Sequence, residues 1–463
     1  MGTGMGTEKQ KEGKKRMRRN QNRLLIGLLL GSLFLMEGTL SIAHAAEGLV
    51  VDLEEGIRLA MEKNERLLMA GKDREKAGQQ VREARADGLP QLDFSLNYNR
   101  NWMLPSLVFA GQTVKIGNNN NITGTLSLRQ PLYSGGKVRA ALASARNFRE
   151  YAGEVERGVR QQVVEQVATA YYDLLLAKRL VQVSQLALDL ARTNLAQAQA
   201  LKRAGRVSDY DLLRAEVQVS SLKADSIRVA NGQKLAEMVY KDIIGLDLQQ
   251  DIEVVEDFDE EAGPPAGDLQ KLVAVGMGRR PELRQLERRL QVQERVVQIE
   301  KAASRPSIDL VASGQAQFQS DKFDVADREW RKNWSSGVVV QFPLFDGLRT
   351  RARVGQARSD LRRAELERDR LEREIRLEIT RAWLDCQDAL ERQKAQEAAV
   401  SQAEKGLQVA ESRYASGAGT QLEILDAQLT LVGARTEWAT ASRDRALGLT
   451  RLELAVGLLG EER

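Results

Sequence analysis

The sequence predicts a mixed, mainly α-helical fold in which a β-hairpin followed by a long helical hairpin occurs twice. Three observations predict this fold. Short motifs recur at a constant offset of 212 residues, prolines are missing from 132–263 and 344–463, and hydrophobic residues alternate with period two between the prolines. Proline costs ~3 kcal/mol inside a helix, so proline-free stretches favour long helices. Alternation with period two is typical of strands.

Residues 1–45 have the pattern of a secretory signal peptide. A basic region precedes the apolar run Leu24–Met36 and the small-x-small cleavage pattern Ala43-His44-Ala45. The run is shorter than the ~20 residues that span a bilayer, so an uncleaved anchor is the less favoured alternative. Met17 is an alternative start of the chain. We expect residues 1–45 to be removed, which leaves no histidine.

Charge and composition argue against two classes of function. The net charge of +4 comes from residues 1–45, which hold eight basic and three acidic side chains. The remainder is near neutral and does not indicate a nucleic-acid partner. Without histidine, and with Cys386 as the single cysteine, the expected mature chain lacks His-based catalytic and metal sites. We therefore predict no enzyme, no cofactor and no metal site.

The repeat defines the predicted domains. The offset of 212 maps Pro131-Leu132-Tyr133 onto Pro343-Leu344-Phe345 and Gly205 onto Gly417, whereas upstream an offset of 216 pairs Pro90 with Pro306. We predict a signal peptide (1–45), a first repeat (46–262) and a second repeat (263–463). Each repeat contains a helix, a β-hairpin (91–130 and 307–342) and a long helical hairpin (137–245 and 349–459). The acidic, proline-rich and glycine-rich linker lies over 256–267.

The helical hairpins begin with two stretches of 67 residues, Lys137–Arg203 and Arg349–Ala415. As helices they would be ~100 Å long. Hydrophobic or small residues follow a strict 4-3 spacing from Val163 to Ala198 and from Ile375 to Ala410, which indicates a coiled-coil seam. Cys386 lies on this seam, so we interpret it as a packed core thiol. The polar seam positions Gln393 and Gln396 are compatible with helices that face water inside a tube.

The hairpins carry the features of a membrane sheet. Leu92, Phe94, Leu96 and Tyr98 alternate with polar residues, and the windows 90–133 and 306–346 hold 11 of the 22 aromatic residues. Trp102, Trp330 and Trp334 lie near the polar loops 102–121 and 320–333, as aromatic girdles do in outer-membrane barrels. A soluble sheet packed on the helices is the alternative. Four strands cannot close a barrel, so we expect two, three or four copies around one axis.

The ordered set of motifs resembles the TolC family of outer-membrane efflux proteins over about residues 50–460. Pro-Leu-aromatic-x-Gly enters each long helix, and the opening Asp52-Leu53-Glu54-Glu55-Gly56 through Asn64 is similar to that family's first helix, with Glu65 in place of a proline. The resemblance implies a homotrimer. Three copies would form a 12-stranded β-barrel in the outer-membrane lipid, continuous with a periplasmic α-helical barrel.

The same resemblance implies a function. The chain would be the outer-membrane exit duct of a tripartite efflux pump or type I secretion system. Its partners would be a periplasmic adaptor (membrane fusion) protein and an inner-membrane transporter of unknown class. The alternative is a secreted coiled-coil structural or adaptor protein with no channel, which predicts uninterrupted heptads and no amphipathic hairpins. The sequence does not indicate the substrate.

The turns of the two helical hairpins are the candidate functional positions. Gly205 and Gly417 suit left-handed C-caps, and Ser208 and Thr420 suit N-caps, with Asp211 and Glu423 completing capping boxes. Caps alone explain both turns. The resemblance adds an adaptor-docking tip formed by Gly205, Val207, Ser208, Asp211, Gly417, Thr420 and Leu422. It also implies a periplasmic aperture ringed by Glu423 and Asp426, for which a solvated helix face is the alternative.

Overall fold

A computed structural model describes residues 49–109, 111–255, 258, 268–322 and 330–459. The predicted signal peptide 1–45 and nearly all of the linker 256–267 lie outside the described residues. The chain divides into two compact units, a small one of residues 1–50 and 251–253 and a large one of residues 51–250 and 254–463. Strands β1 (Leu49–Val51) and β6 (Ile252–Val254) form a two-stranded sheet. The division of the chain into two repeats as domains stays a prediction.

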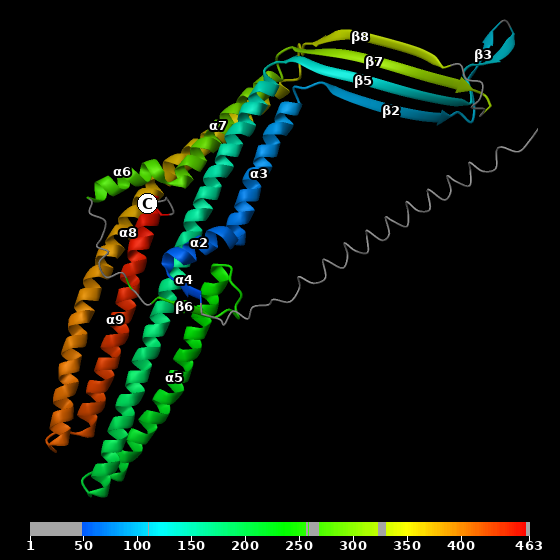
Figure 1. Ribbon diagram of the computed structural model, residues 1–463. Helices are drawn as coiled ribbons and strands as arrows, with labels where there is room; N and C mark the ends of the chain where they lie inside the picture. Colours follow the sequence, from blue (N-terminus) through cyan, green and yellow to red (C-terminus); the bar gives the residue numbers. More distant parts are fainter. Residues whose placement is uncertain (1–48, 110, 256–257, 259–267, 323–329, 460–463) are drawn as a thin grey trace, which may run out of the picture. The chain divides into compact units, whose positions relative to one another are not determined.

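Two helices of 67 residues dominate the large unit, α4 (Lys137–Arg203) and α8 (Arg349–Ala415), with the bounds that the proline-free stretches predict. Each is followed by a shorter helix, α5 (Asp209–Ile243) after α4 and α9 (Gln421–Val456) after α8. Figure 1 shows α5 running back beside α4, and α9 beside α8. The 4-3 seam is buried or half-buried along both long helices, which confirms the coiled-coil packing.

Four shorter helices precede the hairpins: α2 (Leu53–Lys63) and α3 (Glu65–Ala86), then α6 (Leu269–Arg279) and α7 (Pro281–Ala302). The break between α2 and α3 occurs at Asn64 although no proline follows it. The Asn64 side chain accepts from the Arg66 amide at 3.1 Å and donates to the Ile243 carbonyl at 3.1 Å. Helix α4 packs against α3 and α7, and α7 packs against α8.

The predicted hairpins pair into one antiparallel sheet of four strands, in the order β2-β5-β7-β8. The strands are β2 (Gln91–Arg100), β5 (Asn120–Ser134), β7 (Ser307–Ser320) and β8 (Arg331–Gln341). Strand β5 of the first repeat pairs with β7 of the second along most of their length. The two repeats are therefore joined into a single sheet.

Two details of the sheet differ from the sequence prediction. The loop expected over 102–121 contains a small hairpin, β3 (Ser106–Phe109) and β4 (Gln112–Lys115), which turns at Gly111 with a positive φ of 78°. Strand β5 continues to Ser134 instead of ending at 130, because a bulge between Pro131 and Tyr133 accommodates the proline that cannot donate to the ladder.

The core follows the helical seams. Cys386 is 2% exposed and lies in a cluster with Ile375, Ile379 and Leu452, which confirms its interpretation as a packed thiol; burial raises its pKa. The polar seam residue Gln393 donates to the Ser442 hydroxyl of α9 at 3.3 Å, so its polarity is satisfied by the neighbouring helix. Across the described residues, no helix combines the length and apolarity required to cross a membrane.

Candidate functional site: a channel wall and a helical tip

The four-stranded sheet has one apolar and one polar face. On the first face, the row Phe94–Leu126–Gly314–Trp334 crosses all four strands, Tyr98–Ile122–Phe318 crosses three, and Leu92–Leu128–Ala312 continues to Ser336 on β8. On the other face Asn97, Thr123 and Gln317 share a row, and Arg129 forms an ion pair with Asp309 at 3.1 Å. An apolar outer face and a polar inner face are the pattern of a transmembrane β-barrel.

The apolar face has the height of a bilayer. Its rows extend along β7 from Ile308 to Phe318, and the ten steps between these residues span ~33 Å of strand at about 3.3 Å per residue. With a tilt of about 40°, this strand length covers ~25 Å of membrane thickness, the height of the apolar band in outer-membrane barrels. Trp334 is 82% exposed on this face, and the side chains of Phe318 and Trp330 are in ring contact at 5.8 Å.

Both edges of the sheet are open. All ten residues of β2 and all eleven of β8 are exposed, and neither strand has a second neighbour in the sheet. Unpaired strand edges are not tolerated in lipid, because no water is present to bond their amide and carbonyl groups. A sheet of this kind needs further strands from other copies.

The first helical turn, between α4 and α5, is closed by a glycine C-cap. Gly205 has a positive φ of 69°, its amide donates to the Lys202 carbonyl at 2.9 Å, and the Arg206 amide donates to the Leu201 carbonyl at 2.9 Å. These two bonds are the Schellman motif, in which glycine avoids the steric cost of the left-handed region. The predicted C-cap at Gly205 is confirmed.

The second turn, between α8 and α9, repeats this geometry. Gly417 has a positive φ of 80°, its amide donates to the Tyr414 carbonyl at 3.0 Å, and the Ala418 amide donates to the Arg413 carbonyl at 2.8 Å. The match between the two turns shows that the duplicated sequence folds into the same local structure twice. The predicted C-cap at Gly417 is also confirmed.

Both predicted N-caps are present. The Ser208 hydroxyl accepts from the Asp211 amide at 3.1 Å, and the Thr420 hydroxyl accepts from the Glu423 amide at 3.3 Å. The second half of each capping box differs from the prediction. Each hydroxyl donates to the carboxylate three residues on, at 2.6 Å to Asp211 and 3.5 Å to Glu423. The hydroxyl thus acts as acceptor and donor at once, and the carboxylate bonds the hydroxyl rather than the N-cap amide.

An ion pair also bridges the helices at each turn. Lys202 of α4 contacts Asp209 of α5 at 2.8 Å, and Arg413 of α8 contacts Glu423 of α9 at 3.3 Å. The two turns lie close together, since a Cβ built on Gly417 would be 3.5 Å from the Arg206 guanidinium. Sequence reasoning missed Lys202, Asp209 and Arg413, although Lys202 and Arg413 precede their turns by similar spacings.

The predicted aperture residues lie on one open groove between α8 and α9. Glu423 and Asp426 line it together with Arg413, and both carboxylates are exposed. Glu423 is held by Arg413, whereas the Asp426 carboxylate makes no ion pair with any of the residues that the structure describes. Tyr414 is buried beside this region, and its pKa is raised by burial and by the charge of Asp211.

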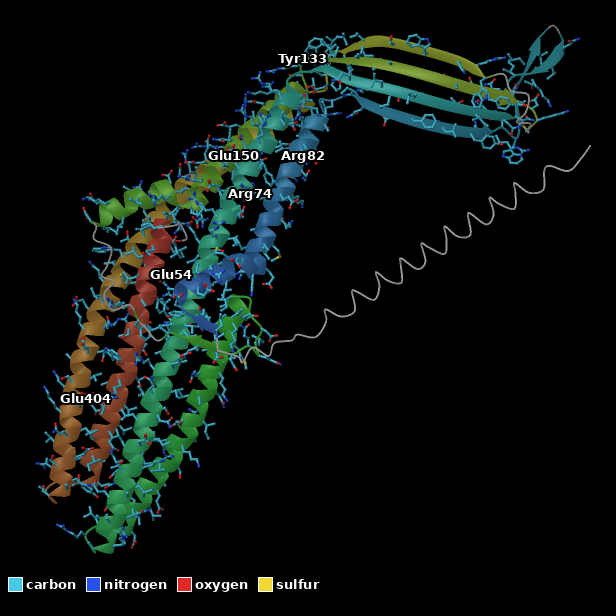
Figure 2. All side chains as sticks on the ribbon, viewed as in Figure 1. Glu54, Arg74, Arg82, Tyr133, Glu150 and Glu404 are labelled. Atoms are coloured by element: carbon cyan, nitrogen blue, oxygen red, sulfur yellow. The ribbon has the colours of Figure 1, made fainter. Side chains whose placement is uncertain are left out.

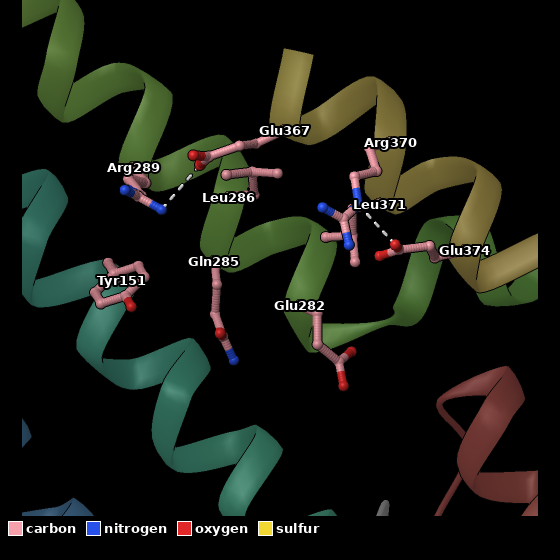
Figure 3. A pocket seen from close by; sticks show the side chains of 9 residues that line it. All are labelled: Tyr151, Glu282, Gln285, Leu286, Arg289, Glu367, Arg370, Leu371 and Glu374. Atoms are coloured by element: carbon pink, nitrogen blue, oxygen red, sulfur yellow. Dashed lines mark hydrogen bonds and ion pairs between the residues drawn. The ribbon is translucent and has the colours of Figure 1, made fainter. Parts of the chain in front are cut away.

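A second hollow of the large unit is lined largely by charged side chains that pair with one another. This cavity of about 300 Å³ lies between α4, α7 and α8. Figure 3 shows its lining residues, which include Tyr151, Gln285 and charged side chains. Its charges are paired internally, Arg289 with Glu367 at 3.1 Å and Arg370 with Glu374 at 2.7 Å. Within the described ranges, no group of three or more histidine, cysteine or carboxylate side chains is placed to hold a metal ion.

The model of the outer membrane efflux protein family matches residues 56–245 and 277–458, which is more than half of the chain. The chain belongs to this family. It is 24% identical to the alkaline protease secretion protein AprF of Pseudomonas aeruginosa over 422 residues, covering 90% of this chain and 86% of AprF. It is 23% identical to the outer membrane protein TolC of Escherichia coli over 419 residues, covering 86% of this chain and 80% of TolC.

Solved structures show the same fold. The crystal structure of the outer membrane protein VceC from Vibrio cholerae superposes with a TM-score of 0.73 at 20% identity, covering 88% of this chain and 96% of VceC. The predicted fold class is confirmed, as is the resemblance to the TolC family. This member of the outer membrane efflux protein family is an exit duct in the outer membrane with a long periplasmic helical extension. Members of the family are channels rather than enzymes.

Proposed function

We propose that three copies of this chain close one 12-stranded barrel and work with a periplasmic adaptor and an inner-membrane transporter. The observation that carries the proposal is the four-stranded sheet, which combines a ~25 Å apolar face, a polar face and two open edges. Three such sheets joined edge to edge enclose a polar lumen. The resemblance to the TolC family supports the number three and the two partners. AprF is named for protease secretion, and the cargo of this chain stays open.

The tip of the helical hairpins is the proposed adaptor-docking surface. It comprises the residues of the two capped turns: Gly205, Val207, Ser208, Asp211, Gly417, Thr420 and Leu422. Two features of the structure support this role. The turns are held rigid by caps and ion pairs, and Tyr210, Leu213 and Leu422 expose 71%, 59% and 56% of their surface beside them. Apolar side chains on a preformed surface suit a protein partner.

Glu423 and Asp426 are the proposed aperture residues. Threefold symmetry would bring three copies of each carboxylate around one axis, where they would attract cations and repel one another. The two carboxylates should contribute unequally to cation binding, because Arg413 offsets the charge of Glu423 within the protomer. We therefore assign the larger part of the cation effect to Asp426. The proposed function requires no catalytic step, and we expect none.

Electrical recording tests the channel and its aperture together. Reconstituted protein should produce discrete conductance steps in planar bilayers. Asp426→Ala should raise the single-channel conductance and weaken block by multivalent cations, and Glu423→Ala should do so less. Asp225→Ala, on α5 and paired with Arg228 at 3.1 Å, is the matched control and should change neither quantity. Absence of any conductance would contradict the channel, whereas unchanged cation block in Asp426→Ala would contradict only the aperture.

A further inference from the structure

The two long helices begin with basic residues at matched positions. The offset of 212 pairs Lys137 with Arg349, Arg139 with Arg351 and Arg146 with Arg358, and all six side chains are exposed. The surrounding segments 134–149 and 347–359 contain no aspartate or glutamate. The near-neutral net charge of the chain conceals this local concentration. Retention of the same three cations in both repeats points to a shared role.

Helix stability does not explain these cations. The amino end of a helix carries partial positive charge, so basic side chains in the first turn are unfavourable there. Both α4 and α8 nevertheless lack acidic residues in the first turn and carry basic ones instead. Within the part of the chain that the structure describes, none of the six makes an ion pair with an acidic side chain. Their charge is available to an external partner.

Contacts at the start of α4 show which of its sides face the neighbouring helices α3 and α7. A Cβ built on Gly88, just after α3, would lie 3.1 Å from the Val138 side chain. A Cβ built on Gly136 would lie 3.5 Å from the guanidinium of Arg305, which follows α7. Val138 thus points toward the end of α3, and the residue after α7 lies on another side of the start of α4. Because successive residues of a helix are rotated by about 100°, Lys137 and Arg139 lie on the two remaining and opposite faces.

The handedness of the sheet determines which of these two faces of α4 is turned toward the axis of the barrel and which is turned away from it. The Asn101 amide donates to the Asn119 carbonyl at 2.7 Å, so odd-numbered residues of β2 direct their backbone groups toward β5. These odd-numbered residues, such as Asn97 and Asn99, also belong to the polar face. For L-residues seen from that face with β2 running upward, β5 must lie to the right of β2. With the polar face inward, the strands and their helices follow one another clockwise when seen from the extracellular side.

This order places Lys137 on the inner wall and Arg139 on the outer surface. Seen from its first residue, a right-handed helix places each successive side chain about 100° further clockwise. Helix α4 starts at the membrane end, and its Val138 side faces α3. One position before Val138 therefore faces the axis of the barrel, and one position after it faces away from the axis. Arg146, seven residues on, shares the face of Arg139. The same construction on α8 takes the buried side of Ala357 as the side that faces α7, the helix packed against α8, and it puts Arg349 inside and Arg351 and Arg358 outside.

These outward arginines lie just below the apolar face of the sheet. Tyr133 pairs with Ile308 in the last apolar row, and Figure 2 shows Tyr133 where β5 runs into α4. Leu344 and Phe345, between β8 and α8, are 88% and 81% exposed, as expected of residues at the boundary of the hydrocarbon. Arg139 and Arg146 are separated by ~10 Å along the helix, comparable to the headgroup layer of a bilayer.

We propose that Arg139, Arg146, Arg351 and Arg358, here called the arginine collar, bind the phosphate groups of anionic phospholipids at the periplasmic surface of the outer membrane. The proposal rests on the proposed closure of the barrel with its polar face inward. Guanidinium groups bond phosphate oxygens in a bidentate manner, and basic residues next to a membrane-spanning segment attract anionic headgroups. Lys137 and Arg349 line the tunnel instead.

Thermal dissociation of the purified trimer in neutral detergent tests the arginine collar. Phosphatidylglycerol should raise the dissociation midpoint of the unmodified protein, and phosphatidylcholine should raise it much less. The variant Arg139→Gln/Arg146→Gln/Arg351→Gln/Arg358→Gln should require at least about tenfold more phosphatidylglycerol for the same rise, because it removes four basic residues that attract anionic headgroups. Without lipid its midpoint should equal that of the unmodified protein.

Two control variants make the result specific. Lys223→Gln/Arg228→Gln/Lys234→Gln/Lys405→Gln removes four exposed charges farther along the helices and should keep the full lipid response. Lys137→Gln/Arg349→Gln should keep that response and shift the ion selectivity of the channel toward cations. An unchanged lipid response in the collar variant would overturn the proposal. So would a collar variant that alters ion selectivity, which would place the arginines inside, or one whose trimer is weakened without lipid, which would make them protomer contacts. Failure of the unmodified protein to form a trimer would instead contradict the proposed function.

Discussion

Leu348 is the residue at which the duplicated sequence conflicts with its backbone. It is the one described non-glycine residue with a positive φ, 65°, and it caps the start of α8. In the first repeat the equivalent position is Gly136, with φ of 90°. A left-handed conformation costs a residue with a Cβ about 1–2 kcal/mol. Leu348 is 60% exposed, so packing does not offset that cost.

Leu348→Gly should therefore stabilise the protein by about 1 kcal/mol. The thermal midpoint for dissociation of the trimer is the measurement. Gly136→Ala is the reciprocal control and should lower the midpoint by a similar amount, because it introduces the same strain into α4. A lower midpoint for Leu348→Gly would show that the Leu348 side chain contributes contacts that the protomer does not contain.

Gly56 allows the closest approach between α2 and α5. A Cβ at this position would lie 2.1 Å from the Tyr240 hydroxyl, and Tyr240 is fully buried with its pKa raised by burial. Gly56→Ala should destabilise the folded chain by about 1–3 kcal/mol through overpacking. Gly71→Ala, in α3 with open space around it, should instead stabilise by up to ~1 kcal/mol through helix propensity. Chemical denaturation of both variants measures the difference, and equal effects would contradict the packing argument.

Among the elements, those fixed by local rules were predictable from sequence. The positions of prolines and glycines predicted the bounds of α4 and α8, because proline is unfavourable in helix interiors and glycine supplies the left-handed C-cap. Strand alternation predicted β2, β5, β7 and β8. The pairing of β5 with β7 was not readable, because it depends on contacts between residues about 190 positions apart.

Contacts that depend on the tertiary fold were missed. Arg280 is 6% exposed, contacts Glu282 and Glu378 at 2.9 Å each, and donates to the Ala455 carbonyl at 3.2 Å. It ties the start of α7 to α8 and α9. An offset of 216 pairs it with Asn64, which makes the corresponding junction in the first repeat. The sequence signal was therefore the repeat position and not the residue type.

The candidate site was predicted in part. Caps at Gly205, Gly417, Ser208 and Thr420 follow from residue type and are present in the structure. The ion pair between Arg413 and Glu423 was not foreseen, because the register across the turn is set only when both helices pack. The docking and aperture roles stay predictions, since they concern surfaces shared with other chains.

The tip turns should be separable from membrane insertion. Gly205→Pro with Gly417→Pro removes two amide donors and demands a negative φ where the structure has 69° and 80°. The turns lie ~100 Å of helix from the sheet, so the variant should reach the outer membrane and fail in export. Gly232→Pro, within α5, is a control for general helix disruption away from the tip. Loss of the tip variant from the outer-membrane fraction would contradict this separation.

At the scale of the whole molecule, one chain supplies only part of the wall of a β-barrel. The sheet offers an apolar outer face and a polar inner face, and its edge strands β2 and β8 are exposed throughout. The chain belongs to the outer membrane efflux protein family, whose members are channels. The need to pair two edges therefore calls for further copies of the chain, and the resemblance to the TolC family supports the proposed number of three.

The mass of the detergent-solubilised particle tests this central claim most directly. Sedimentation equilibrium in density-matched detergent should give three chain masses for a particle that retains its β-sheet circular dichroism signal. The edge strands can be satisfied only by other copies, so dissociation should coincide with loss of that signal. A stable monomer with the β signal intact would contradict the account, because four strands would then form a complete structure without partners.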